Sequence, residues 1–557
     1  MKKCLIISLF FLSSAISIYF VLSCEMTSPV DNVKVIFNAA SIKTTIAVDI
    51  VDAKTQEQIG IYTNQLTELS IEGPGKNYVV DISGKSQNKF KTNYGILCFA
   101  LDNSITPTTE NPIELILLAK SDGYLPVSYP LTISSEGGIS VLIYIVNLNN
   151  LPQGVSSKTI NIGRTDNSGK VTSPVEIATD PEFISRVTAS MYVPVGTTIK
   201  DAYGEVLNGN LTASITYFSN RSDESTKCFP TGNFIVKVNE GKDIISNGIF
   251  YTGGFVNFNI IDESGRSAKN FDSSITLNMQ IPNGTYNPDT KNNIIAGDIV
   301  PIWSYDETKG IWNFEKKLII ASPNAIGNYP LNFSSNHISN WNIDWFTTQT
   351  PQNIRKIRNT VRERDRIILE LEKNQGTSLL RANINQNISP YLLMFKMINS
   401  SQYFYSSGYI NEYRSFMNNA LVPCEEPITI EVWEGCPFRI TGTIQLLNIC
   451  GLNEIIIPTN ETNFGGNEKN IQITVSGYCS QDTTILIRPN VPIWINDGCR
   501  WKYSGLMENG KISFANLKEG NLYTFGIWYD NNFYKESYII QKTSYNYKFL
   551  FPAELCK

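Results

Sequence analysis

The sequence contains a single histidine, His337, among its 557 residues. A zinc-protease HExxH motif needs two histidines, and a Ser-His-Asp arrangement could use only this one, so the scarcity excludes much of the catalytic repertoire. Patterns for a nucleophile elbow, a phosphate-binding loop or a dinucleotide site are also missing. The sequence therefore predicts a protein that is not an enzyme and that has no cofactor and no metal site.

Two alternatives to this prediction stay open. The acids of a glycosidase can come from anywhere in a fold, so a hydrolase with an unrecognised carboxylate pair has no motif that would exclude it. Calcium is the one plausible ion, because turns at Asp262, Asp289 and Asp306 supply oxygen ligands. None of these turns has the spacing of an EF-hand loop.

Blocks of basic residues are also lacking. The net charge is -5, and a mildly acidic chain of this kind is a poor ligand for nucleic acid. Hydrophobic residues make up 42% and charged residues 17%, which is a globular composition. The chain is long enough for several domains, and its many aromatic, Ile and Thr residues favour β-strands.

Only the N-terminus has a long hydrophobic run. Lys2 and Lys3 precede an uncharged run from Leu5 to Leu22, and Ser23 and Cys24 follow in the layout of a bacterial lipoprotein signal. We therefore expect residues 1–23 to be a signal peptide, Cys24 to be lipidated and residues 24–33 to form a tether. Glu25 is not the Asp that retains lipoproteins in the inner membrane, which favours the outer membrane and the cell surface. The alternative is an uncleaved transmembrane anchor.

The sequence contains ten cysteines but no CxxC motif. Because an exported chain meets an oxidising compartment, an even set of cysteines is first interpreted as disulfides. Cys98 and Cys228 lie far from the others and could equally be buried hydrophobic residues. We expect at least two disulfides among the six C-terminal cysteines, which are Cys424, Cys436, Cys450, Cys479, Cys499 and Cys556.

The pattern of strands and turns predicts an all-β fold of several β-sandwich domains in tandem with one inserted α-helix. Short apolar strands and turn clusters predict an N-terminal sandwich at 34–155, and a Ser-, Thr- and Gly-rich linker follows at 156–183. The central sandwich module spans 184–346. A helical and Tyr-rich insert is expected at 347–422, where apolar residues from Ile354 to Leu371 have helical spacing. A Cys-rich sandwich ends the chain at 423–557.

The central module contains four of the eight tryptophans and the only histidine between residues 297 and 346. Trp303 and Trp312 flank a turn in which Asp306 can accept hydrogen bonds from the backbone and Gly310 can take positive φ, so we expect a hairpin. Alternation predicts inward faces for two strands, and His337 is expected to form structural hydrogen bonds. The inward residues are Leu211, Ala213, Ile215, Tyr217, Ile275, Leu277, Met279 and Ile281.

The order W-S-Y-D, T-x-G and H-x-S-x-W-N in this segment resembles a module in surface lipoproteins of Bacteroidetes-type bacteria and, more distantly, one in animal cartilage intermediate layer protein. Residues 52–59 and 119–124, and later 509–523, resemble carboxypeptidase regulatory-like sandwiches. Such domains carry no catalytic residues. The resemblance implies an architecture rather than an activity.

Exposed aromatic rings are the remaining candidates for binding, because they stack on sugars or anchor protein partners. Trp501 lies between Arg500 and Lys502, which suggests partial exposure, and Trp494 and Trp528 are in the same region. The sequence thus predicts a lipid-anchored binding or structural scaffold protein with a protein or glycan partner. The alternative is a carbohydrate-binding component of a glycan-capture system.

Overall fold

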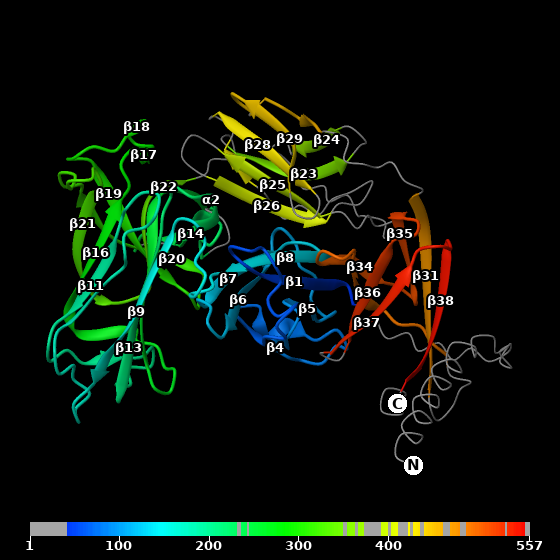
Figure 1. The fold of residues 1–557 in the computed structure, drawn as a ribbon, viewed down its shortest axis with the longest axis horizontal. Helices are drawn as coiled ribbons and strands as arrows, with labels where there is room; N and C mark the ends of the chain where they lie inside the picture. Colours follow the sequence, from blue (N-terminus) through cyan, green and yellow to red (C-terminus); the bar gives the residue numbers. More distant parts are fainter. Residues whose placement is uncertain are drawn as a thin grey trace, which may run out of the picture.

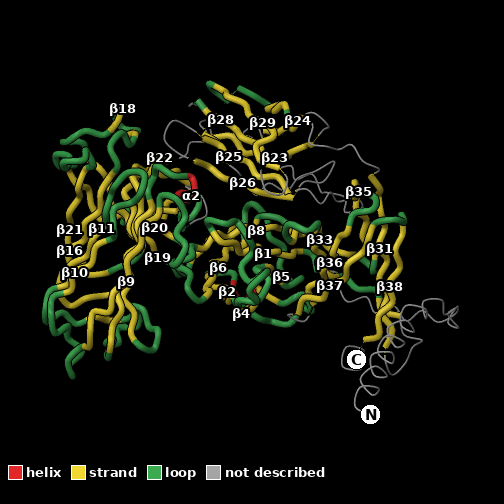
Figure 2. Tube along the Cα trace, viewed as in Figure 1, coloured by secondary structure: helices red, strands yellow, loops and turns green. Residues whose placement is uncertain are grey.

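A computed structural model of the chain describes residues 42–230, 235–241, 244–348, 354–362, 366–371, 392–398, 403–409, 421–423, 427–434, 439–449, 451–459, 468–479, 486–529 and 532–551. Within these ranges the regular secondary structure is almost entirely β-strand, and loops join the strands (Figure 2). The strands build four units, of which the central module, first sandwich and last sandwich lie in a row and the third sandwich lies beside the first (Figure 1). The predicted all-β class with tandem sandwiches is confirmed.

The first sandwich spans residues 44–145. One sheet has the order β3-β5-β1-β8, with β8 parallel to β1, and the other has the order β4-β2-β6-β7. A short 3-10 turn, η1, covers Lys76–Tyr78. The strands are β1 (Thr44–Asp52), β2 (Thr67–Glu72), β3 (Val79–Val80), β4 (Lys89–Thr92), β5 (Ile96–Leu101), β6 (Ile113–Ser121), β7 (Val127–Ile133) and β8 (Gly137–Ile145).

The last sandwich, residues 468–551, repeats the pairing pattern of the first. Its first strand pairs antiparallel with the fourth long strand and parallel with the final one, as β1 pairs with β5 and β8. Its second sheet, β34-β33-β36-β37, matches β4-β2-β6-β7. The strands are β31 (Glu468–Cys479), β32 (Leu486–Ile487), β33 (Val491–Asn496), β34 (Trp501–Met507), β35 (Lys511–Lys518), β36 (Leu522–Tyr529), β37 (Asn532–Ile539) and β38 (Ser544–Phe551).

The third sandwich, residues 354–458, follows the same plan with one extra strand. Its sheets are β26-β25-β28-β29 and β27-β23-β24-β30, so β24 stands between the first and last strands, which are adjacent in the other two sandwiches. The strands are β23 (Ile354–Arg362), β24 (Arg366–Leu371), β25 (Leu392–Ile398), β26 (Tyr403–Tyr409), β27 (Leu421–Pro423), β28 (Ile428–Glu434), β29 (Arg439–Leu446) and β30 (Glu454–Pro458).

The inserted α-helix expected from Ile354 to Leu371 is wrong, because β23 and β24 occupy this stretch as an antiparallel pair. Both strands have partners elsewhere in the chain, since β23 pairs with β27 and β24 pairs with β30. The segment is rich in Ile and Val, which fit a pleated sheet. Helical spacing of apolar residues was therefore overridden by strand pairing that is distant in sequence.

The central module, residues 155–348, packs a seven-stranded sheet against a five-stranded one. The orders are β14-β20-β19-β22-β15-β13-β9 and β10-β11-β16-β12, with β21 also on β16. The elements are β9 (Val155–Arg164), β10 (Val175–Ala178), β11 (Ala189–Val193), β12 (Ile199–Lys200), β13 (Asn210–Phe218), α2 (Asp223–Thr226), β14 (Ile235–Asn239), β15 (Ile244–Asp262), β16 (Asn270–Ile281), β17 (Tyr286–Asn287), β18 (Asn292–Asn293), β19 (Ile299–Asp306), β20 (Ile311–Ile319), β21 (Tyr329–His337) and β22 (Asn340–Thr348).

The expected linker at 156–183 is wrong as a boundary, because β9 and β10 are edge strands of the central module. Strand β9 pairs with β13 from Val155 to Arg164. Ile160 and Ile162 alternate along it and pack on the module's core. This alternation was the signal of a strand within a Ser- and Thr-rich stretch.

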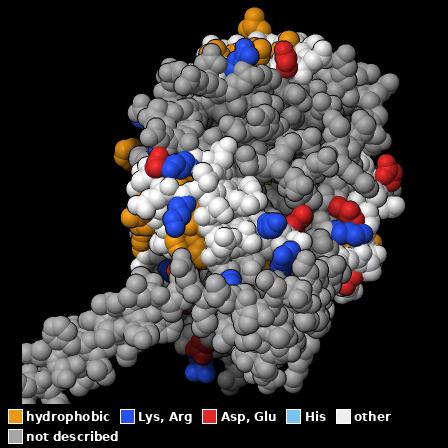
Figure 3. Space-filling view, turned by 90° about the vertical axis from the view of Figure 1, so that its right-hand side faces the viewer, with side chains coloured by type: hydrophobic (Ala, Val, Ile, Leu, Met, Phe, Trp, Pro, Cys, Tyr) orange, Lys and Arg blue, Asp and Glu red, His pale blue; other side chains and the backbone are white. Residues whose placement is uncertain are grey.

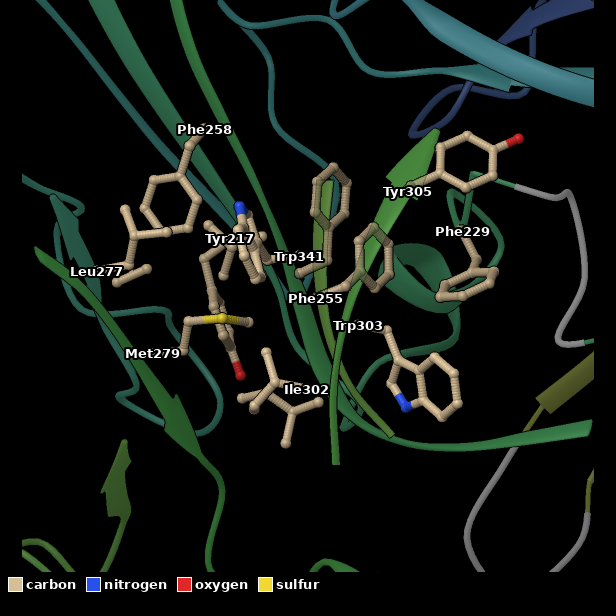
Figure 4. Close-up of a cluster of buried hydrophobic side chains, with 14 of the residues drawn as sticks. Tyr217, Phe229, Phe255, Phe258, Leu277, Met279, Ile302, Trp303, Tyr305 and Trp341 are labelled. Carbon is tan, nitrogen blue, oxygen red and sulfur yellow. The ribbon is translucent and has the colours of Figure 1, made fainter. Parts of the chain in front are cut away.

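The core of the central module lies on both faces of the seven-stranded sheet. Trp341 packs with residues such as Leu277 and Met279 of the facing sheet, while Trp303 lies on the other face (Figure 4). The rings of Trp303 and Trp312 both contact Phe250. Phe229, just after α2, stacks on Trp312 with 5.2 Å between ring centroids. All eight residues predicted to point inward are buried, as are the four tryptophans.

The predicted hairpin is confirmed. Strands β19 and β20 pair antiparallel, and Tyr305 lies opposite Trp312. The Asp306 carboxylate accepts hydrogen bonds from the backbone N–H groups of Thr308 and Lys309, and Gly310 has φ of 67°. The Gly310 position has no room for a side chain, because a Cβ would lie 2.6 Å from Ile116 of the first sandwich.

Candidate interaction surface

The three tryptophans predicted to bind a ligand are buried. Trp501 is only 4% exposed, and Trp494 and Trp528 are buried more deeply. They share one face of the sheet β34-β33-β36-β37 with Tyr503 and Phe533, and the Phe533 ring contacts all three. We call these five residues the aromatic face.

The aromatic face is buried because the first sandwich covers it. The Tyr94 ring lies 5.4 Å from the Phe533 ring, and the Thr45 hydroxyl lies 3.2 Å from that of Tyr503. The two sandwiches share a single hydrophobic cluster. The prediction that Trp501 is partly exposed is therefore wrong, although its ring does lie on an outer face of its own sandwich.

The charged neighbours of Trp501 misled the prediction because they are buried as well. Arg500 lies 3.6 Å from the Asp49 carboxylate of the first sandwich. Lys502 is bonded to Asp497 at 2.6 Å, and burial lowers the pKa of Lys502. Each buried cation thus has a carboxylate partner, as buried charges require, although only that of Arg500 is itself buried.

The only histidine forms structural contacts, as expected. His337 Nε2 lies 3.1 Å from Glu315, and the ring stacks on Trp341. Burial alone would raise the pKa of Glu315, but hydrogen bonds from His337 and Ser304 bring it below the ordinary value. Because Ser304 donates to Glu315 rather than to His337, these three residues do not form a serine nucleophile with a histidine base.

Two of the three turn carboxylates considered for calcium, those of Asp262 and Asp306, accept hydrogen bonds from nearby backbone N–H groups. At Asp262, one carboxylate oxygen accepts hydrogen bonds from the backbone N–H groups of Ser264 and Arg266. The Arg266 guanidinium forms ion pairs with both Asp262 and Asp201, so it already supplies the positive charge that a calcium ion would bring to these carboxylates. No group of three His, Cys, Asp or Glu side chains in the described ranges could hold a metal ion.

The structure describes the state of three cysteines, and the prediction of at least two disulfides stays a prediction. Cys98 and Cys228 are buried and free, and burial raises the pKa of the Cys228 thiol to about 12. Cys499 is disulfide-bonded. Cys479 ends β31, and its side chain is not described. The other disulfide candidates lie outside the described residues, as does Cys24; they are Cys424, Cys436, Cys450 and Cys556.

Exposed hydrophobic side chains gather instead at one end of the central module. This apical surface has six members on three connections, 179–188, 282–299 and 319–328. Ile299 and Ile319 form a cross-strand pair that is 52% and 72% exposed. The six residues are Phe183, Ile184, Ile295, Ile299, Ile319 and Ile326.

Hydrogen bonds hold these connections together. The Asn328 side chain donates to Ser185 O at 2.7 Å and accepts from Asn283 N at 3.1 Å. Farther along, the Gly297 N–H donates to Ile320 O at 2.8 Å. The three connections therefore form one preformed surface rather than independent loops.

Sequence reasoning missed the apical surface because an isoleucine next to a strand is easily taken for the buried last residue of that strand. Ile295 and Ile326 precede turn glycines within Asn-rich stretches, and that position could have marked them as exposed. On the side of the last sandwich, basic and acidic side chains are interspersed over the described residues (Figure 3).

Comparisons with known proteins give no family. No family model matches the chain, and no curated protein matches it. Solved structures that align with it include BcpA, the major pilin subunit of Bacillus cereus, at 7% identity over 92% of this chain and 99% of that one, with a TM-score of 0.12. The Bacillus anthracis TIE protein aligns at 10% identity over 72% and 76%, with a TM-score of 0.11. TM-scores this low carry no argument about fold or function.

Proposed function

We propose that this chain is a lipid-anchored binding or structural scaffold protein of the bacterial outer membrane, and that the apical surface is where it meets its partner. The observation that carries the proposal is the concentration of six exposed apolar side chains on interlocked connections at one end of a sandwich. Contiguous exposed apolar residues on a folded protein mark interaction sites.

The composition of the apical surface favours a protein partner. Five of its six residues are isoleucines, which can fill apolar pockets but present no flat ring to a sugar. A glycan partner, the alternative, would have to use exposed rings such as Phe183, Tyr62 and Tyr203, because the aromatic face is covered. Of these three, only Phe183 lies on the apical surface.

The arrangement of the units fits an anchor at Cys24. Seventeen residues separate Cys24 from Ile42, so the tether can reach at most roughly 60 Å. The described chain enters at β1, beside the last sandwich, and the central module lies on the opposite side of the first sandwich (Figure 1). No helix in the described ranges is long and apolar enough to cross a membrane. The apical surface would thus stand away from the point of attachment.

Photo-crosslinking on intact cells tests the partner surface. A benzophenone amino acid at Ile326 should give an adduct of defined mass, and the double substitution Ile299→Asp and Ile319→Asp should abolish that adduct. Leu447→Asp is the matched control, because Leu447 is 83% exposed on the third sandwich. An adduct that survives the double substitution, or one that Leu447→Asp also removes, would contradict the proposal.

The anchor is tested separately. Cys24→Ala should leave an unprocessed precursor that takes up no radiolabelled palmitate, because the Cys24 sulfur is the only acyl acceptor that the signal layout provides. Palmitate entering the Cys24→Ala chain would refute the anchor while leaving the apical surface unaffected.

A further inference from the structure

The side chain of Gln58 in the first sandwich forms two hydrogen bonds with the backbone of Trp501 in the last sandwich. Its Nε2 donates to Trp501 O at 2.8 Å, and its Oε1 accepts from Trp501 N at 2.9 Å. Trp501 begins β34, which is at the edge of its sheet. The amide therefore supplies the pair of hydrogen bonds that a neighbouring strand would give to an open edge.

Further contacts surround this pair of hydrogen bonds. Arg500 and Asp49 form an ion pair in which both side chains are more than nine-tenths buried. The Lys535 ammonium of the last sandwich lies over the Tyr94 ring of the first, 5.2 Å from the ring centroid. Because Cys499 is disulfide-bonded, the residue just before this docking segment is held covalently.

We infer that Gln58 and the segment from Arg500 to Tyr503 form a clasp, which closes the chain on itself and makes the first and last sandwiches one cooperative unit. Their buried hydrophobic residues form one cluster, and those of the central module form another, which also takes in residues of the third sandwich and Ala53 after β1. More than 300 residues lie between the two sandwiches in sequence. The clasp keeps the aromatic face covered and fixes the start of the folded chain beside the last sandwich.

Native-state hydrogen exchange of the intact chain over a urea series tests the clasp. In the wild type, peptides from β1 and β34 should lose protection at the same urea concentration, and peptides from β16 at a different one. Gln58→Ala removes two buried hydrogen bonds and should speed exchange about tenfold in both β1 and β34. It should leave β16 unchanged.

Gln65→Ala is the matched control. The Gln65 side chain also donates two hydrogen bonds, to Ser121 Oγ and Asp122 O, but both lie within the first sandwich. Because these two hydrogen bonds are partly exposed and lie away from Trp501, Gln65→Ala should speed exchange in β34 much less than Gln58→Ala does. Tyr94→Ala provides a second route, since it removes the ring that covers Phe533, and should act on β34 as Gln58→Ala does. The clasp is refuted if β34 and β1 lose protection at different urea concentrations in the wild type, or if neither Gln58→Ala nor Tyr94→Ala changes exchange in β34.

Discussion

The aromatic face and the apical surface are both apolar areas on the outside of a sandwich, yet the first is buried and the second is exposed to solvent. The aromatic face carries three tryptophans and is covered by another sandwich of the same chain. The apical surface is mostly aliphatic and stays open. The comparison teaches that the exposure of a residue within its own domain does not show whether it is available to a partner. Contacts between domains decide that.

The largest expected effects come from emptying the buried aromatic sites. Trp501→Ala should lower the free energy of unfolding by about 3–5 kcal/mol, as large core truncations do, and should weaken both the first and last sandwiches. If Trp501 were exposed, as the sequence alone suggests, Trp501→Ala would leave the melting point unchanged. The burial of Trp501 reverses that expectation. Urea denaturation with hydrogen exchange by region measures the loss.

Trp312→Ala should lower the free energy of unfolding of the central module by about 3–5 kcal/mol, as much as Trp501→Ala lowers that of the first and last sandwiches. Trp312 is fully buried against Phe229 and Tyr305. Its indole N–H has no hydrogen-bond partner among the described residues, so Trp312→Phe should cost less. Equal losses for Trp312→Phe and Trp312→Ala would show that ring burial is not what stabilises this site.

Breaking the ion pair between the sandwiches should have the next largest effect. Arg500→Met leaves the Asp49 carboxylate buried without its cation and should cost about 3 kcal/mol. Adding Asp49→Asn removes that charge and should recover most of the loss. A double variant as unstable as Arg500→Met alone would indicate that packing rather than charge dominates here. Thermal unfolding of the four chains of this cycle decides between the two.

A smaller effect, dependent on pH, is expected at Asp344 in the central module. Burial raises the pKa of Asp344 well above its ordinary value, and hydrogen bonds from Thr252 and Asn342 offset only part of this. A carboxyl with a raised folded-state pKa contributes its full stability below its unfolded pKa, and this contribution is lost as pH rises through the folded value. Asp344→Asn cannot ionise, so its stability relative to the wild type should rise with pH.

The gain from Asp344→Asn should reach roughly 1–3 kcal/mol at high pH, the scale of an unsatisfied buried polar group. Urea unfolding of both chains at pH 5 and pH 9 measures it. A difference between the chains that is the same at both pH values would contradict a protonated Asp344 in the folded state.

The smallest effect on stability is expected at the apical surface. Ile319→Ser should change the free energy of unfolding by less than about 0.5 kcal/mol, because an exposed side chain leaves no cavity. A loss close to that of Trp312→Ala would mean that the apical isoleucines belong to the core. Thermal melts of the two variants side by side make the test.

The sequence predicted local structure well and domain contacts poorly. Alternation placed Ile275, Leu277, Met279 and Ile281 on an inward face, because every second side chain of a strand points to the same face of the sheet. The turn at Asp306 was predictable from its own side chains. The strand β24 was not, since one of its two partners, β30, lies more than 80 residues away.

The candidate site was the least predictable part for the same reason. Arg500 and Lys502 indicate exposure when only neighbouring residues are considered, but the Asp49 carboxylate that allows Arg500 to be buried is some 450 residues distant. The covering of Trp501 by Gln58 is equally remote. For the isoleucines of the apical surface the error was the reverse, because exposed residues were not recognised as exposed. Their neighbours in the sequence do not reveal whether another unit covers them.

Solvent labelling of the intact, native chain tests this account most directly. Photolysed diazirine adds carbenes to accessible side chains, and mass spectrometry then gives the yield at each residue. The account predicts high yields at Ile295, Ile299 and Ile319, and yields at Trp494, Trp501 and Trp528 as low as at the core residue Trp312. Labelling of the three C-terminal tryptophans at the level of the exposed Tyr203, with the isoleucines protected, would contradict it.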